Sequence, residues 1–111
     1  MSEYPASTPE PPYYMVIFSS VRTAVEEGYG STADRMEELA QQQPGYLGME
    51  SVRGADGAGI TISYWASEEA IAGWSKHAEH VVAKRTGVKH WYERYVLRVG
   101  MVERQRVFER P

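Results

Sequence analysis

The residues best suited to chemistry gather in the second half of the chain, on a helix predicted over residues 67–86. Drawn at 100° per residue, this helix has one apolar face, which we expect to contact a sheet. Trp74 lies near the centre of that face, so it is either a core tryptophan or the wall of a cavity. His77 lies at the edge of the face beside Trp74, whereas His80 points nearly opposite, so His77 is the candidate acid or base. Arg85 lies on the same face, where its guanidinium either reaches solvent or binds a carboxylate or an anionic ligand.

Further aromatic side chains stand where they could line a pocket next to this helix. Tyr64 and Trp65 are adjacent on a predicted strand and face opposite sides, so only one of them can contribute. The run His90-Trp91-Tyr92 lies in a short connection before the last strand, where it either closes one end of the fold or forms a lid. The sequence therefore predicts an aromatic pocket between helix 67–86 and the sheet.

Several kinds of active site are excluded by what the sequence lacks. The chain has no cysteine, which excludes iron–sulfur clusters and thiol catalysis. His77 and His80 have diverging directions and no obvious third ligand, so no metal site is predicted. The glycines Gly54, Gly57 and Gly59 join two strands instead of opening a helix, and we interpret them as a hairpin turn, not a phosphate loop. No residue pattern for hydrolysis or phosphoryl transfer is apparent.

Length and composition indicate one small domain. The 111 residues carry 12 Lys and Arg against 15 Asp and Glu, a net charge of −3, and 42% are hydrophobic. A chain this short buries only about two-thirds of the surface that it exposes when unfolded, so a partner chain would help its stability. No apolar run reaches the roughly 18 residues of a membrane span, and the N-terminus lacks a secretion signal. We expect a cytoplasmic protein that binds neither membranes nor, given its acidic balance, nucleic acid.

Four strands and two helices are predicted, in the order β-α-β-β-α-β. Residues 1–12 hold four of the six prolines and are expected to form a flexible tail, which leaves residues 13–111 as one domain. The strands are expected at 13–18, 46–53, 60–65 and 95–99, with a C-terminal extension through 101–108. The helices are expected from Ser31 or Thr32 to 43 and from the N-cap Ser67 to about 86. This order is typical of an α+β, ferredoxin-like sandwich with a C-terminal strand extension.

The sheet of such a sandwich needs a partner on one side. The first strand, Tyr13 to Phe18, is apolar at both alternations, so neither of its sides is expected to face water. The two helices cover only one face of a four-stranded sheet, which leaves the other face bare. We therefore expect a homodimer in which two sheets pack face to face and the C-terminal extension reaches the neighbour.

Three stretches resemble the antibiotic biosynthesis monooxygenase family. They are Pro44-Gly45-Tyr46-Leu47-Gly48, Ile62-Ser63-Tyr64-Trp65-Ala66-Ser67-Glu68-Glu69-Ala70, and Trp74 with the downstream His90-Trp91-Tyr92-Glu93. The resemblance covers about residues 13–108 and implies a dimeric α/β barrel. The family includes cofactor-independent oxygenases that turn phenols or hydroquinones into quinones, and haem-degrading enzymes. For the haem-degrading branch the resemblance implies an Asn, a Trp and a His; Trp74 matches, but Ser19 or Ser20 replaces the Asn and the His position falls near Lys84.

Taken together, the resemblance and the residues predict a monooxygenase that oxidises a small aromatic compound with O₂ and has no cofactor. The protein then has to supply a pocket, a base and a donor that stabilises a phenolate or a peroxide. The predicted catalytic residues are His77, Trp74 and Arg85, and the predicted substrate-binding residues are Tyr64 or Trp65, Trp91, Tyr92 and Ser19. The alternative is a non-catalytic homodimer that binds a small aromatic ligand, and haem degradation is less favoured.

Overall fold

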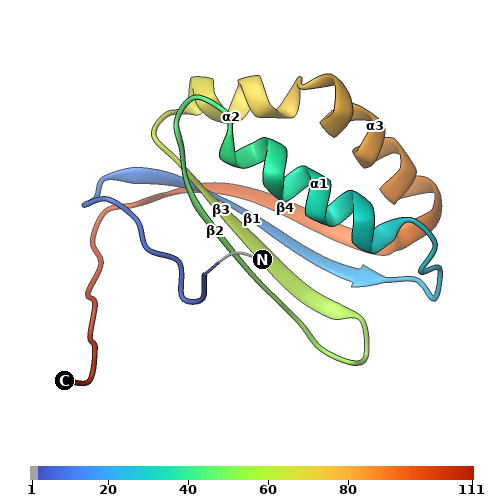
Figure 1. The fold of residues 1–111 in the computed structure, drawn as a ribbon, viewed down its shortest axis with the longest axis horizontal. Helices are drawn as coiled ribbons and strands as arrows, with labels where there is room; N and C mark the ends of the chain where they lie inside the picture. Colours follow the sequence, from blue (N-terminus) through green and yellow to red (C-terminus); the bar gives the residue numbers. More distant parts are fainter. Residues whose placement is uncertain (1–2) are drawn as a thin grey trace.

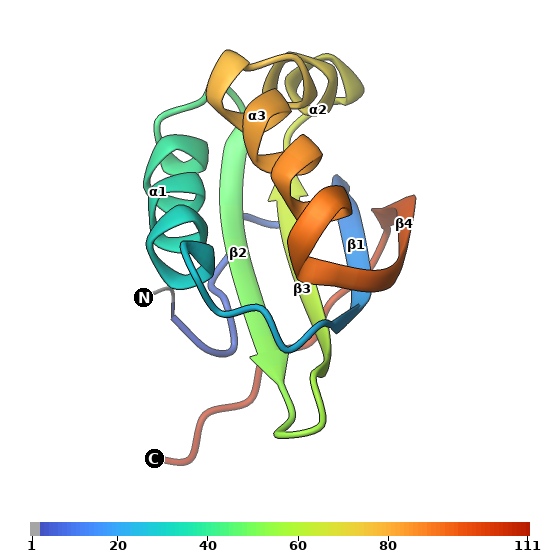
Figure 2. The same cartoon turned by 90° about the vertical axis from the view of Figure 1, so that its right-hand side faces the viewer.

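A computed structural model describes residues 3–111 and shows a four-stranded antiparallel sheet with its helices on one face (Figure 1). The strand order is β2-β3-β1-β4, the order of a ferredoxin-like sandwich, which confirms the predicted fold class. Turned by 90°, the molecule shows no helix on the other face of the sheet (Figure 2). The elements are β1 Tyr13–Arg22, α1 Tyr29–Gln41, β2 Tyr46–Arg53, β3 Ala58–Trp65, α2 Glu68–Ser75, α3 Ala78–Thr86, a π-helical turn Gly87–Trp91 and β4 Tyr92–Val102.

The central strand β1 is held by neighbours on both edges. Tyr14 pairs with Trp65 of β3 on one side and with Met101 of β4 on the other. Because side chains alternate along a strand, Tyr14 and Val16 face the helices, while Met15 and Ile17 face the uncovered side. Both rows are apolar, as expected for a strand with two covered faces, and only one of these faces is covered by helices.

The core lies between the sheet and the helices and is built around Trp65, which is completely buried. Its ring stacks on Trp74 of α2, with 6.4 Å between the ring centroids, and meets Tyr46 edge-on. Leu39 and Ala40 of α1 complete the buried cluster. The indole N–H of Trp65 donates to Ser63 Oγ at 2.9 Å, so burial of the ring leaves no polar group unsatisfied.

The helix predicted over residues 67–86 is divided into α2 and α3, which corrects the sequence prediction. The Nδ1 atom of His77 accepts a hydrogen bond from the backbone N–H of Glu79 and so caps α3. The break rotates α3 relative to α2, and the continuous apolar face drawn for residues 67–86 does not exist. Val82, on the face drawn for this helix, is 60% exposed. Arg85 is also exposed, which agrees with the alternative in which its guanidinium reaches solvent.

One further boundary differs from the sequence prediction. Helix α1 begins after Gly28, whose φ of +76° is left-handed, and not after Ser31 or Thr32. Helix α3 ends at Thr86, as expected, and the chain then continues as the π-helical turn. In the β2–β3 hairpin, Gly57 has a positive φ of +89°.

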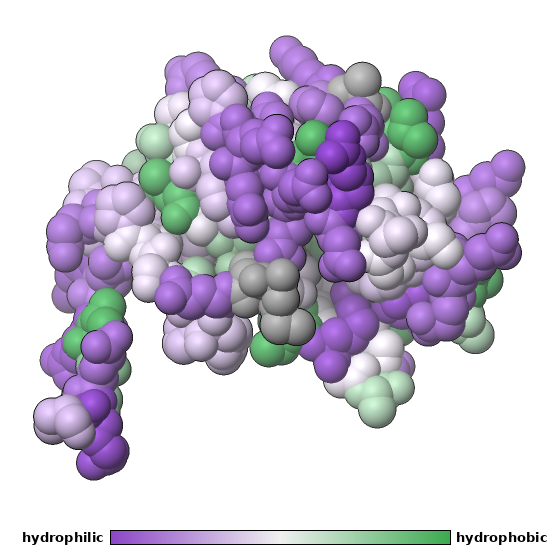
Figure 3. Space-filling view, viewed as in Figure 1, coloured by the Kyte–Doolittle hydropathy of each residue, from purple (hydrophilic) through white to green (hydrophobic). Residues whose placement is uncertain are grey.

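The segments outside the sandwich lie along and beyond the sheet. Residues 3–12, expected to be a flexible tail, contain no helix or strand. They are bonded to the domain, since the Ala6 N–H donates to Glu50 Oε1 at 2.8 Å and the Thr8 hydroxyl is hydrogen-bonded to the Tyr13 hydroxyl at 2.8 Å. Strand β4 ends at Val102, so the predicted strand over 101–108 stops early. Residues 103–111 project from the body (Figures 1 and 3). Among the described residues, no helix is both long and apolar enough to cross a membrane.

Candidate functional site

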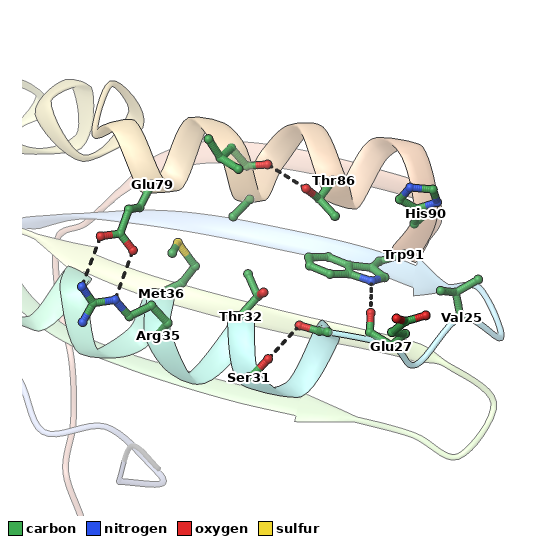
Figure 4. A pocket seen from close by; sticks show the side chains of 13 residues that line it. Val25, Glu27, Ser31, Thr32, Arg35, Met36, Glu79, Thr86, His90 and Trp91 are labelled. Carbon is green, nitrogen blue, oxygen red and sulfur yellow. Dashed lines mark hydrogen bonds and ion pairs between the residues drawn. The ribbon is translucent and has the colours of Figure 1, made fainter.

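A groove of about 770 Å³ lies between α1 and α3 (Figure 4). Helix α1 contributes a row of side chains one turn apart, α3 contributes a facing row, and the connection before α1 and the π-helical turn close the inner end. This volume is within the range of small-molecule binding sites. The lining residues are Ser31, Thr32, Arg35 and Met36 from α1; Glu79, Val82, Ala83 and Thr86 from α3; and Val25, Glu27, Gly28, His90 and Trp91 from the connections.

Trp91 forms the deep wall of the groove and is only 6% exposed. Its indole N–H donates to the backbone oxygen of Glu27 at 3.0 Å, and its backbone oxygen accepts from the Thr23 N–H at 2.8 Å. Its ring meets Tyr29 edge-on, with 5.7 Å between centroids. Single-turn π-helices occur frequently at functional sites, and here the turn fixes the position of Trp91 by hydrogen bonds at both ends of the residue.

The two ends of the groove differ in character (Figure 4). At one end Arg35 joins α1 to α3 through two hydrogen bonds to the Glu79 carboxylate, each 3.1 Å long. These bonds raise the pKa of Arg35 and lower the pKa of Glu79. At the other end lies the exposed imidazole of His90. The contact of His90 with Thr23 is made by its backbone oxygen, at 2.6 Å, so the imidazole is free to act on a ligand.

The walls between these ends combine apolar surface with hydroxyl groups. Met36 and Val82 face the groove from opposite helices, and Thr32 and Thr86 add hydroxyls. The Thr86 hydroxyl donates to the backbone oxygen of Val82 at 3.1 Å. Apolar walls with a few polar groups are typical of sites for small organic molecules.

An aromatic and basic cluster lies beneath the groove. Tyr92 contacts Phe18, with 5.2 Å between ring centroids, and burial together with the neighbouring Tyr29 raises the pKa of Tyr92. The guanidinium of Arg22 lies 3.3 Å over the ring of Tyr29. A Cβ at Gly87 would come within 2.9 Å of the Tyr92 ring, so the close approach of this ring requires glycine at position 87.

The structure separates most of the site residues predicted from the sequence. Trp91 lines the groove and Tyr92 lies beneath it. Trp65 and Trp74 belong to the core, and Trp74 also borders a smaller cavity of about 290 Å³ beside Pro44 and Gly45. His77 caps α3, and its ring lies 5.5 Å from that of Trp74, so the expected position beside Trp74 agrees with the structure. The ring of His80, which was expected to point nearly opposite, stacks on Trp74 at 4.3 Å between centroids.

The remaining predicted residues lie away from the groove. Arg85 is exposed and does not line the groove. Ser19 and Tyr64 lie on the uncovered face of the sheet, because Ser19 alternates with the helix-facing Ser20 and Tyr64 with Trp65. The Tyr64 hydroxyl donates to Glu50 Oε2 at 2.5 Å, and burial, followed by this bond, raises the pKa of Tyr64.

The groove residues on α1 were not identified from the sequence. Thr32, Arg35 and Met36 recur at intervals of one helical turn, which is a detectable signal for one face of a helix. Their partner Glu79 lies 44 residues further along the chain, and no local pattern links the two positions.

The residues that would hold haem do not fit that group. Ser20 is bonded to the Arg53 guanidinium at 2.8 Å, Trp74 is buried against Trp65, and the Lys84 ammonium is bonded to Ser75 at 2.9 and 3.1 Å. These positions share no cavity. Within residues 3–111, no group of three or more His, Asp or Glu is arranged to hold a metal ion.

Comparisons with known proteins agree with the fold. Residues 12–86 match the model of a family described as antibiotic biosynthesis monooxygenase. The Bacillus subtilis protein YqjZ is 57% identical over 109 residues, which cover 98% of this chain and 96% of YqjZ. The structure of SnoaB, described as a cofactor-independent oxygenase from Streptomyces nogalater, superposes with a TM-score of 0.68 at 11% identity, over 90% of this chain and 100% of SnoaB. A crystal structure from Shewanella oneidensis gives a TM-score of 0.72 at 6% identity, over 87% and 96%.

Proposed function

Because the chain belongs to the antibiotic biosynthesis monooxygenase family, we propose that it oxidises a small phenol or hydroquinone with O₂ in the groove between α1 and α3. The groove itself carries this proposal, because it combines a buried tryptophan wall, apolar sides and one free imidazole. The site differs from the one predicted between helix 67–86 and the sheet, where Trp65 and Trp74 fill the space with their own rings.

The reaction balances without a metal, a flavin or an added reductant. Deprotonation of the phenol produces an electron-rich phenolate, which transfers an electron to O₂, and the two radicals combine into a carbon–oxygen bond. Loss of water from the resulting hydroperoxide leaves a quinone. One oxygen atom of O₂ becomes the new carbonyl, and the other leaves as water with the two hydrogens that the phenol loses.

We assign the first proton transfer to His90 and the positioning of the ring to Trp91. A general base has to lie within hydrogen-bond reach of the proton that it removes, and the His90 imidazole lies at the same end of the groove as the Trp91 ring (Figure 4). The apolar side chains of Met36 and Val82 line the groove from opposite helices, so a bound ring would contact both and displace water from them.

Oxygen uptake with a panel of hydroquinones and anthrones tests this function. His90→Ala should lower kcat/KM by at least about 100-fold, as expected for loss of a general base, and should leave the fold intact because only its backbone is bonded to Thr23. The matched control is Lys89→Ala, an exposed neighbour in the same turn. Saturable binding without oxygen consumption would instead identify a non-catalytic binding protein, and turnover that survives His90→Ala would remove His90 from the mechanism.

We also propose that the uncovered face of the sheet pairs with a second copy. Val52 and Ile60 on this face are 52% and 42% exposed. Burying such residues is favourable by about 25 cal/mol per Å². Light scattering that gives a monomer at micromolar concentration would contradict this assembly.

A further inference from the structure

We propose that the groove between α1 and α3 selects uncharged aromatic ligands and rejects aromatic carboxylates and phosphates of the same size. This inference rests on the proposed function, since it concerns the same groove. It follows from the charges that line the groove and from the hydrogen bonds that these charges already make.

The single cation among the lining residues is already paired with two carboxylates. The Nε and Nη2 atoms of Arg35 donate to the Glu79 carboxylate, and its Nη1 atom donates to Glu38 at 3.1 Å. All three nitrogens of the guanidinium therefore have carboxylate partners. The guanidinium has five N–H groups, so one N–H remains on each Nη atom. An anion that binds these two groups would lie next to the carboxylates of Glu38 and Glu79, which repel it.

The buried guanidinium of Arg22 is also occupied by contacts within the protein. Arg22 lies close to the inner end of the groove, but its Nε donates to the Trp91 oxygen at 3.3 Å and its Nη2 to the Val25 oxygen at 2.8 Å. The ring of Tyr29 covers its guanidinium. Arg22 thus braces the inner end of the groove and does not line it.

The remaining charges repel anions. Glu27 and Glu79 both line the groove, so its lining carries two carboxylates against one guanidinium. A carboxylate that enters must also leave water for walls formed by side chains such as Met36 and Trp91, which is costly without an ionic partner. Repulsion and desolvation act in the same direction, and we expect an anionic ligand to bind at least tenfold more weakly than its neutral counterpart.

The hydroxyl groups on the walls suit the neutral ligand. The Thr32 hydroxyl can donate or accept a hydrogen bond, which matches phenol, ketone and ester oxygens. The Ser31 hydroxyl donates to the Gly28 backbone oxygen at 3.2 Å and can still accept a bond from a phenol. The preferred ligand is therefore a planar, uncharged phenol, and any carboxyl group on it has to be esterified or absent.

Two probes of nearly equal size test the selectivity: methyl 6-hydroxy-2-naphthoate, which is neutral, and 6-hydroxy-2-naphthoate, which is an anion at pH 7. Their dissociation constants are measured by isothermal titration calorimetry with the full chain. We expect the ester to bind at least tenfold more tightly than the acid. Equal affinities, or tighter binding of the acid, would overturn the selectivity and leave the proposed function standing. Absence of binding for both probes up to about 1 mM would overturn the groove as a ligand site and the proposed function with it.

A charge-removing variant tests whether the selectivity for the neutral ligand arises from these charges. Glu79→Gln removes one carboxylate and releases two donors of Arg35, so the preference for the ester should fall by at least fivefold, through tighter binding of the acid. The control Glu109→Gln makes the same change of charge in the exposed C-terminal segment and should keep the wild-type ratio. An unchanged ratio in Glu79→Gln, with the fold confirmed by circular dichroism, would contradict the role assigned to these charges.

Discussion

Two single variants, Trp91→Phe and Trp74→Phe, test whether the ligand binds in the groove between α1 and α3 or beside the core. The two side chains are almost equally buried, at 6% and 9% exposed, but only Trp91 lines the large groove. The same substitution should therefore reduce stability at both positions and reduce ligand affinity at only one.

The cost in stability follows from the contacts that each ring loses. The smaller ring gives up roughly 50 Å² of buried surface, or about 1 kcal/mol at 25 cal/mol per Å², and incomplete repacking adds a cavity cost of similar size. Trp91→Phe also leaves the Glu27 oxygen without its donor, which adds about 1 kcal/mol. Both variants should lose about 1–3 kcal/mol, and each kcal/mol lowers the Tm of a domain of this size by about 4–8 °C.

The affinity for methyl 6-hydroxy-2-naphthoate should respond differently. Trp91→Phe shortens the deep wall of the groove and should raise the Kd about tenfold, equivalent to about 1.4 kcal/mol. Trp74→Phe should change the Kd by less than about twofold, because its ring packs on Trp65 and His80. Thermal unfolding gives the stability, and calorimetry at a temperature where both variants are folded gives the Kd. If Trp74→Phe raised the Kd as much as Trp91→Phe does, the binding site would belong beside α2 and the reasoning from the groove would be refuted.

Four further substitutions test the local structure. Gly45→Ala should lower the free energy of unfolding by about 2–4 kcal/mol, because φ is +82° and the new Cβ would meet Ala70 Cβ at 2.6 Å. Gly73→Ala, with open space around it on α2, should raise the free energy of unfolding by up to about 1 kcal/mol. Changes of the same sign for both variants in urea unfolding would contradict this reasoning. Ser67→Ala should lower the free energy of unfolding by about 1 kcal/mol, because it removes the bond that the Ser67 hydroxyl accepts from the Ala70 N–H. A decrease below a few tenths of a kcal/mol in the same urea unfolding experiment would show that the cap contributes little. Burial lowers the pKa of His80 from 6.5, so the stability that the neutral ring provides is complete above about pH 6.5 and is lost as the pH falls through the folded-state pKa. His80→Phe should therefore lose less stability than the wild type between pH 7 and pH 5. Parallel pH profiles of stability for the two proteins would show that His80 does not cause the pH dependence.

The fold could be predicted because its signals are local. The apolar run from Tyr13 to Phe18, the turn at Gly57 and the N-cap at Ser67 each act over a few residues, and the structure contains all three. The order of the elements then leaves few ways to arrange the sheet.

The candidate site could not be predicted in the same way, because it depends on the break between α2 and α3 and on the ion pair between Arg35 and Glu79. The sequence between Ser75 and His77 has no proline or glycine to mark the break. Projecting one helix through this point therefore placed Val82 on the face expected to contact the sheet, although Val82 is exposed. The ion pair of Arg35 and Glu79 depends on how α1 and α3 settle on the sheet. Among the predicted site residues, Trp91 lies in the last connection, as expected, but groove residues such as Thr32 and Met36 come from the first helix.

The position of β1 between β3 and β4 also determines the order in which the chain can complete its sheet during synthesis. Strand β1 is made first, has apolar side chains on both faces, and finds its first partner only when Ala58–Trp65 has emerged. Its second edge stays open until Tyr92–Val102 is available. Pairing of this kind is slow, because distant segments have to meet, and open strand edges favour aggregation. A chain that stops before β4 therefore leaves one edge of β1 unpaired, and synthesis of Tyr92–Val102 is the step that closes this edge.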